Sequence, residues 1–142
     1  LDLFGKGVVH GGTFNAQPVA MAATLATLDA LTPELFAGIE TRGRRLMDGI
    51  AAELATAGHK AVVTGWPQVF HVAFDIDGPA HNWRDLAKMN RAKYVRFTAA
   101  LLAHGVRALE RGAWFMSAAH DDSIVDQTLE AVRKAAKEIG AA

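Results

Sequence analysis

The residues best suited to bind a ligand lie near the start of the chain, in a glycine-rich loop before an alanine-rich stretch. The loop reads His10-Gly11-Gly12-Thr13-Phe14-Asn15-Ala16-Gln17-Pro18. Adjacent glycines let the backbone approach a ligand closely, successive N–H groups can surround an anion, and the Thr13 hydroxyl adds a donor. A helix expected to begin at Pro18 favours negative charge nearby. The loop therefore suits a phosphate, although a Gly-Gly pair before a helix is more often only a turn.

Other ligand and nucleophile chemistries fit this region poorly. Gly5-Lys6-Gly7 lacks the spacing and the following Ser or Thr of a P-loop. An esterase interpretation of His10-Gly11-Gly12 needs a serine flanked by glycines, and neither Ser117 nor Ser123 has them. Lys6 is a poor Schiff-base candidate, because nothing in its polar, glycine-rich surroundings would desolvate the amine.

Histidines and arginines offer fewer signals. The 6 histidines show no pair at metal-ligand spacing with a carboxylate, so no metal site is predicted. His71, on an expected strand, and His120, before an expected helix, are interpreted as structural. Arg111 lies in the turn Glu110-Arg111-Gly112 between two expected strands, where a guanidinium can bind a carboxylate. A solvated turn arginine is an equally good interpretation.

The apolar periodicity predicts helices that cover a small sheet, which is the α+β fold class. Helices are expected over 19–31, from Thr32 to Gly58, over 83–104 and from Asp121 to Gly140, and strands over 61–64, 69–74, 106–109 and 114–117. Thr32 and Asp121 are the expected N-caps, and Gly58 and Gly105 are expected to end two of the helices.

Composition excludes several classes of function. The chain has 142 residues, enough for one modest domain, and its 15 basic and 15 acidic residues predict no surface for nucleic acid or anionic lipid. The absence of cysteine excludes disulfides and a thiolate nucleophile and fits a cytoplasmic protein. The apolar run 19–31 is too short and too interrupted to span a bilayer. The start at Leu1-Asp2-Leu3-Phe4, without an initiator methionine or a signal sequence, predicts a piece of a longer polypeptide.

Three groups of residues, in register over nearly the whole chain, carry a family signal. The first is Val8-Val9-His10-Gly11-Gly12-Thr13-Phe14 with Pro18 and Ala20-Met21-Ala22-Ala23. The second is Val63-Thr64-Gly65 with Val69-Phe70, and the third is Gly105-Val106, Phe115-Met116-Ser117-Ala118-Ala119-His120 and Thr128-Leu129-Glu130-Ala131. Together they resemble the C-terminal part of class III aminotransferases, which depend on pyridoxal phosphate (PLP). The most similar branch contains glutamate-1-semialdehyde 2,1-aminomutase and the β-amino-acid aminotransferases.

The resemblance implies a fold-type I enzyme that is a homodimer with PLP at its interface. It assigns residues 1–31 to the end of the large PLP-binding domain and residues 32–142 to a small C-terminal domain with a short antiparallel sheet. Gly12 and Thr13 would hold the phosphate of the neighbouring subunit's cofactor. The Schiff-base lysine of the family would lie upstream, so no catalytic residue is expected in this chain and the chain alone is predicted to be inactive.

Two departures from the aminomutase pattern bear on the substrate. Gln17-Pro18 replaces the usual Asn-Pro, a mild change, whereas Arg111-Gly112-Ala113 replaces a Phe-Glu-Ala run. A guanidinium at this place disfavours the aminomutase and suits an aminotransferase that binds the carboxylate of a substrate or keto acid, as the β-amino-acid aminotransferases do. An aminomutase-like isomerase is the close alternative, and a non-catalytic α+β interaction module is the alternative of another class.

Overall fold

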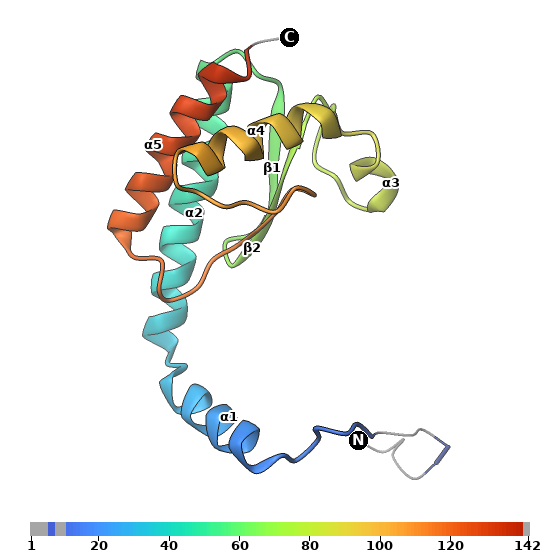
Figure 1. Ribbon diagram of the computed structural model, residues 1–142, viewed down its shortest axis with the longest axis vertical. Coiled ribbons are helices and arrows are strands. Elements are labelled where there is room, and N and C mark those ends of the chain that lie inside the picture. Colours follow the sequence, from blue (N-terminus) through green and yellow to red (C-terminus); the bar gives the residue numbers. More distant parts are fainter. Residues whose placement is uncertain (1–5, 8–10, 141–142) are drawn as a thin grey trace. The chain divides into compact units, whose positions relative to one another are not determined.

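The computed structural model describes residues 6–7 and 11–140, and it divides the chain into two compact units (Figure 1). The first unit is Leu1–Pro33 and the second is Glu34–Ala142. The assignment of these parts to a large and a small domain is a separate matter and stays a prediction.

The first unit contains the helix α1, Pro18–Ala30, which begins at the expected proline. The Gln17 side chain caps it by accepting the N–H of Ala20 at 2.7 Å. No residue of α1 is buried, and apolar side chains such as Leu25 and Leu28 are exposed. In the described part of the chain no single helix is long and apolar enough to cross a membrane; α1 and α2 pass that criterion only as a bent pair, by length and composition.

The second unit is built on a three-stranded antiparallel sheet with the order β1-β2-β3. β1 is Ala61–Trp66, β2 is Val69–Phe74 and β3 is Ala113–Phe115. Val63 pairs with Val72, and Phe70 pairs with Trp114. The expected fold class, α+β with a short antiparallel sheet, is therefore confirmed.

Three long helices supply the rest of the core: α2 (Pro33–Thr56), α4 (Arg91–Ala103) and α5 (Asp122–Glu138). Alternate residues of β2, namely Phe70, Val72 and Phe74, are buried on the side of the strand that packs against these helices. The largest fully buried side chains of the core include Phe74, Ile50, Leu54, Tyr94, Phe97, Leu101, Val125 and Val132. The rings of Phe74 and Phe97 meet edge to face with centroids 5.5 Å apart, a favoured aromatic geometry. Asp121 caps α5 as expected, with its carboxylate accepting the N–H of Ile124 at 2.9 Å.

The single long helix expected over 83–104 is wrong. The structure has a short helix α3, Trp83–Leu86, and then α4, separated by a break at Asn90. The Asn90 side chain caps α4 through the N–H of Lys93, and its amide also donates to Asp75. The Asn90 backbone N–H donates to the carbonyl of Phe74. Asn90 is thus attached to the end of β2, and the helix does not continue through it. This tertiary contact overrides the apolar periodicity that predicted one long helix.

The strand expected over 106–109 is also absent. Gly105, with φ +84°, ends α4, and the Val106 N–H returns to the carbonyl of Leu101 at 2.9 Å. The following residues are irregular and have no strand partner in the described part of the chain. The last strand begins at Ala113 and ends at Phe115, so it is shorter than the expected 114–117 segment at its C-terminal end. β1 reaches Trp66, two residues beyond the expected end at Thr64.

Candidate functional site

The glycine-rich loop has free hydrogen-bond donors. The Asn15 N–H donates to the carbonyl of Gly12 at 3.0 Å, which closes a turn around Thr13. Within residues 11–140, neither the Thr13 hydroxyl nor the backbone N–H groups of Gly12 and Thr13 have a partner, and all of these residues are exposed. His10, Val8 and Val9 lie outside the described residues. The loop is therefore both a turn and a set of outward donors that fits a phosphate group.

The space beside Gly12 is restricted from within the loop. A Cβ at Gly12 would lie 3.0 Å from Oδ1 of Asn15, whereas a Cβ at Gly11 would meet nothing within 4 Å. A larger residue at position 12 would therefore require the Asn15 side chain to shift.

Arg111 lies in a turn that the backbone fixes closely. The Gly112 N–H donates to Leu109, the Gly112 carbonyl accepts the N–H of Val72 at 3.0 Å, and the Arg111 carbonyl lies 2.7 Å from Nε2 of His71. Gly112 has φ +96°, and a Cβ there would lie 2.0 Å from the His71 ring. His71 therefore has the structural role expected of it, and it positions the turn that carries Arg111.

The Arg111 side chain borders an open cavity of about 660 Å³. One wall is α4 and the other is the segment 107–111, and the lining also includes Arg91, Arg107 and Glu110. No carboxylate among the described residues forms an ion pair with Arg111. The guanidinium is thus available to a carboxylate from outside the described chain. Arg91 and Arg107 could not be recognised from the sequence as members of a site, because only the fold brings them to the same cavity.

His120 has a local role, as expected. Its Nδ1 accepts the backbone N–H of Ser117 and lies 3.0 Å from the Ser117 hydroxyl. A serine beside a histidine suggests a nucleophile, but this ring nitrogen already accepts an amide three residues away. The contact therefore stabilises the turn before α5.

Two further polar groups are structural as well. Tyr94 is buried, and desolvation raises its pKa to about 12, against the smaller opposing effect of the hydrogen bond from Trp114. The Trp114 indole donates to the Tyr94 hydroxyl at 3.0 Å. A phenol with such a high pKa stays protonated near neutral pH, so it is no base there.

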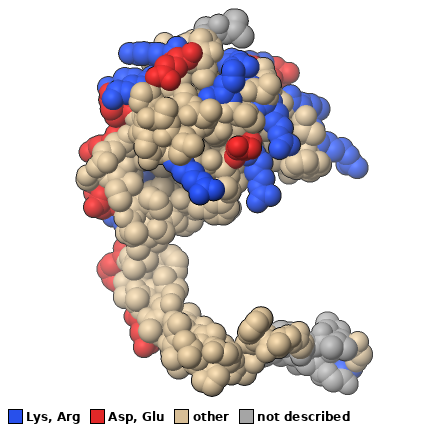
Figure 2. Space-filling model, in the orientation of Figure 1, with Lys and Arg blue, Asp and Glu red and all other residues tan. Residues whose placement is uncertain are grey.

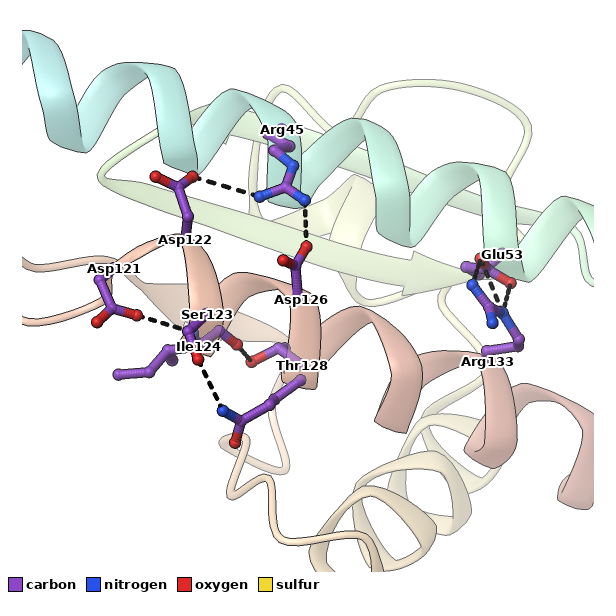
Figure 3. A network of polar contacts seen from close by, with 10 residues as sticks. Arg45, Glu53, Asp121, Asp122, Ser123, Ile124, Asp126, Thr128 and Arg133 are labelled. Carbon is purple, nitrogen blue, oxygen red and sulfur yellow. Dashed lines mark hydrogen bonds and ion pairs between the residues drawn. The ribbon is translucent and has the colours of Figure 1, made fainter.

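Ion pairs join α2 to α5 on the surface (Figure 3). Arg45 pairs with Asp122 and Asp126, and Arg133 donates to both carboxylate oxygens of Glu53. The hydrogen bond to Glu53 and its charge raise the pKa of Arg133. These carboxylates bind arginines of the same unit, so they are not free acids or bases for a ligand.

The chain is similar to several transaminase-type proteins. It is 35% identical over 130 residues to glutamate-1-semialdehyde 2,1-aminomutase of Sorangium cellulosum (strain So ce56), covering 90% of this chain and 30% of that protein. It superimposes with a TM-score of 0.78 on a β-phenylalanine aminotransferase from Variovorax paradoxus, at 28% identity over 89% of this chain and 29% of the other. It also matches the Sphingopyxis sp. MTA144 FumI protein in its PLP internal aldimine form, with a TM-score of 0.75, 26% identity and 94% of this chain covered.

The resemblance to PLP-dependent transaminases is confirmed. The chain spans about 30% of the length of the curated relative and of the solved structures that it matches. No protein-family model matches it. The homology to part of these proteins and the fold are thus established, whereas the roles of Gly12, Thr13 and Arg111 stay predictions.

Proposed function

We propose that this chain is part of a PLP-dependent aminotransferase that moves an amino group between an amino acid or amine and a keto acid. The observation that carries the proposal is the match of 89% or more of the chain to a β-phenylalanine aminotransferase and to a PLP-bound FumI protein. The free donors of the glycine-rich loop support the same cofactor. The proposed assembly is a homodimer, and the absence of cysteine supports a cytoplasmic location.

The loop would hold the phosphate of PLP. The Thr13 hydroxyl and the N–H groups of Gly12 and Thr13 would donate to the phosphate oxygens, and the N-terminus of α1 would add a favourable dipole. PLP, when bound, supplies the electron sink for amino-group transfer. The chain's own contribution is to anchor the cofactor at one end, in the site of the neighbouring subunit.

Arg111 would bind the carboxylate of the substrate. Its guanidinium has no ion-pair partner in the described chain and stands on a turn held by His71. The planar guanidinium of an arginine binds a carboxylate through two parallel hydrogen bonds, which the ammonium group of a lysine cannot form. An aminomutase-like isomerase is the second candidate, which the 35% identity to such an enzyme favours. The guanidinium at position 111 favours the aminotransferase.

Replacing Thr13 by valine should weaken cofactor binding. Thr13→Val keeps the shape of the side chain and removes one hydrogen bond to a charged group, which is worth about 1.5–3 kcal/mol. The measurement is the equilibrium dissociation constant for PLP in a transaminase-length polypeptide that contains this sequence. Thr24→Val is the control, because the Thr24 hydroxyl only donates to Ala20 within α1. Equal PLP affinities for the Thr13 variant and the unchanged protein would refute the assignment.

The 142-residue chain alone should not transaminate. None of the resemblance motifs in it carries the lysine that such enzymes use, and Lys6 is an exposed residue of a turn. Incubation with PLP and borohydride, followed by peptide mass spectrometry, should find no stoichiometric adduct at any lysine. A single fully labelled lysine, together with amino transfer by this chain, would contradict the prediction.

A further inference from the structure

The segment that follows α4 carries backbone groups that have no hydrogen-bond partner in the described chain. Its ends are tied by the bonds from Val106 to Leu101 and from Gly112 to Leu109. Between them, Arg107 and Ala108 form no hydrogen bond with any described residue. The sequence favours a strand over 106–109, yet this segment has no ladder partner. Free N–H and C=O groups on such a segment are a template for pairing with another strand.

This segment forms one wall of the cavity of about 660 Å³ whose other wall is α4. The α4 wall presents Val95, Ala99 and Leu102, spaced four and then three residues apart, which places them on one face of the helix. Val95 is 37% exposed and Leu102 61% exposed, so this face is uncovered in the described chain. From Arg91 to Leu102 the helix rises about 16 Å, the length of about five residues of extended chain.

The lining of this cavity, which we call the α4 groove, is basic. Arg91 and Arg107 line it together with Arg111, none of them has an ion-pair partner among the described residues, and Glu110 is its only carboxylate. Because 106–111 turns back from the end of α4, Arg107 lies near that end and Arg91 at the start of the helix. Lys and Arg side chains predominate over acidic ones on the face that carries α4 (Figure 2).

We propose that this groove binds an extended acidic peptide segment that pairs with residues 106–109 as an added strand. The free backbone groups would supply the pairing, the apolar face of α4 would cover the peptide's apolar side chains, and Arg91 and Arg107 would receive carboxylates at its two ends. The concave shape and the unpaired backbone favour a peptide over a membrane surface. The inference does not rest on the proposed transaminase activity. Arg111 lines the same groove, but it is not one of the proposed peptide contacts.

The test uses the 142-residue chain and a fluorescein-labelled peptide of sequence Glu-Thr-Val-Thr-Val-Thr-Glu, with fluorescence anisotropy as the readout. Binding should saturate, weaken with added salt, and slow amide hydrogen exchange at Arg107 and Ala108. A peptide with Lys in place of both Glu residues should bind at least about tenfold more weakly, because it meets arginines with like charge. A peptide N-methylated at all five residues between its two Glu residues should lose binding, since neither edge of the strand then carries the N–H groups that the ladder needs.

Variants of the chain locate the site. Arg107→Gln should weaken binding of the acidic peptide about tenfold. Arg96→Gln is the matched control, because Arg96 is an exposed arginine of α4 that does not line the groove. Equal affinity for the acidic and the basic peptide, retained binding after N-methylation, or equal effects of the two arginine variants would overturn the proposal. So would absence of binding, or self-association of the chain through residues 106–109.

Discussion

Gly43→Ala is expected to destabilise the second unit by about 3 kcal/mol, the upper part of the range for overpacking a core. Gly43 lies on the buried side of α2, where the helix passes the turn between β1 and β2. A Cβ at this position would lie 2.2 Å from the carbonyl oxygen of Pro67 and 2.7 Å from its carbonyl carbon. Both are backbone atoms of a buried residue, so relief requires the helix and the turn to separate. The free energy of unfolding from denaturant titration is the measurement.

Gly38→Ala in the same helix is the matched control. There a Cβ would meet only the tip of the flexible Arg42 side chain, at 3.3 Å. Because alanine is about 1 kcal/mol better than glycine inside a helix, this variant should be equally stable or more stable. If both variants lose the same stability, the close packing of α2 on the 66–69 turn is wrong.

Arg111→Ala should lower kcat/KM for carboxylate-bearing substrates by a factor that corresponds to about 2–4 kcal/mol, as expected for the loss of a desolvated charge partner. The protein for this test is a transaminase-length polypeptide that contains the present sequence. The substitution keeps the backbone carbonyl that His71 contacts, so the turn itself should persist. Arg111→Lys should also lower the rate, because an ammonium group cannot reproduce the bidentate fork.

The contrast between substrates is what identifies the contact. Simple amines without a carboxylate should react almost unchanged in the first half-reaction, which is followed in a single turnover without a keto acid. Arg96→Ala, which changes an exposed arginine of α4 outside the cavity lining, should affect neither kind of donor. Equal losses for donors with and without a carboxylate would make Arg111 a structural turn residue and would remove the main reason to prefer the aminotransferase over the aminomutase.

Local chemistry was sufficient to predict the elements whose signals lie within a few residues. Pro18 and Asp121 mark helix starts, and the alternation over 69–74 marks β2, in agreement with the structure. The helix break at Asn90 could not be predicted in this way. Its cause is a hydrogen bond to Phe74, a residue of another element that is distant in the sequence.

The candidate site shows the same division. The donors of Gly12 and Thr13 are adjacent in sequence, so their common loop could be recognised from residue types alone. The surroundings of Arg111 depend on how residues 107–111 run back along α4. The sequence analysis expected a strand over 106–109 and so did not predict this path. The presence of Arg91 and Arg107 in the cavity lining was therefore seen only in the structure.

The central claim, intermolecular amino transfer by a PLP enzyme that contains this chain, is tested most directly with an isotopic label. A transaminase-length polypeptide carrying this sequence is incubated with PLP, a ¹⁵N-labelled β-amino acid and an unlabelled keto acid, and the products are followed by mass spectrometry. We expect ¹⁵N to appear in the amino acid formed from the keto acid, and we expect the transfer to stop when PLP is removed. Label that moves only between two carbons of the donor's own skeleton, or transfer that persists without PLP, would contradict it.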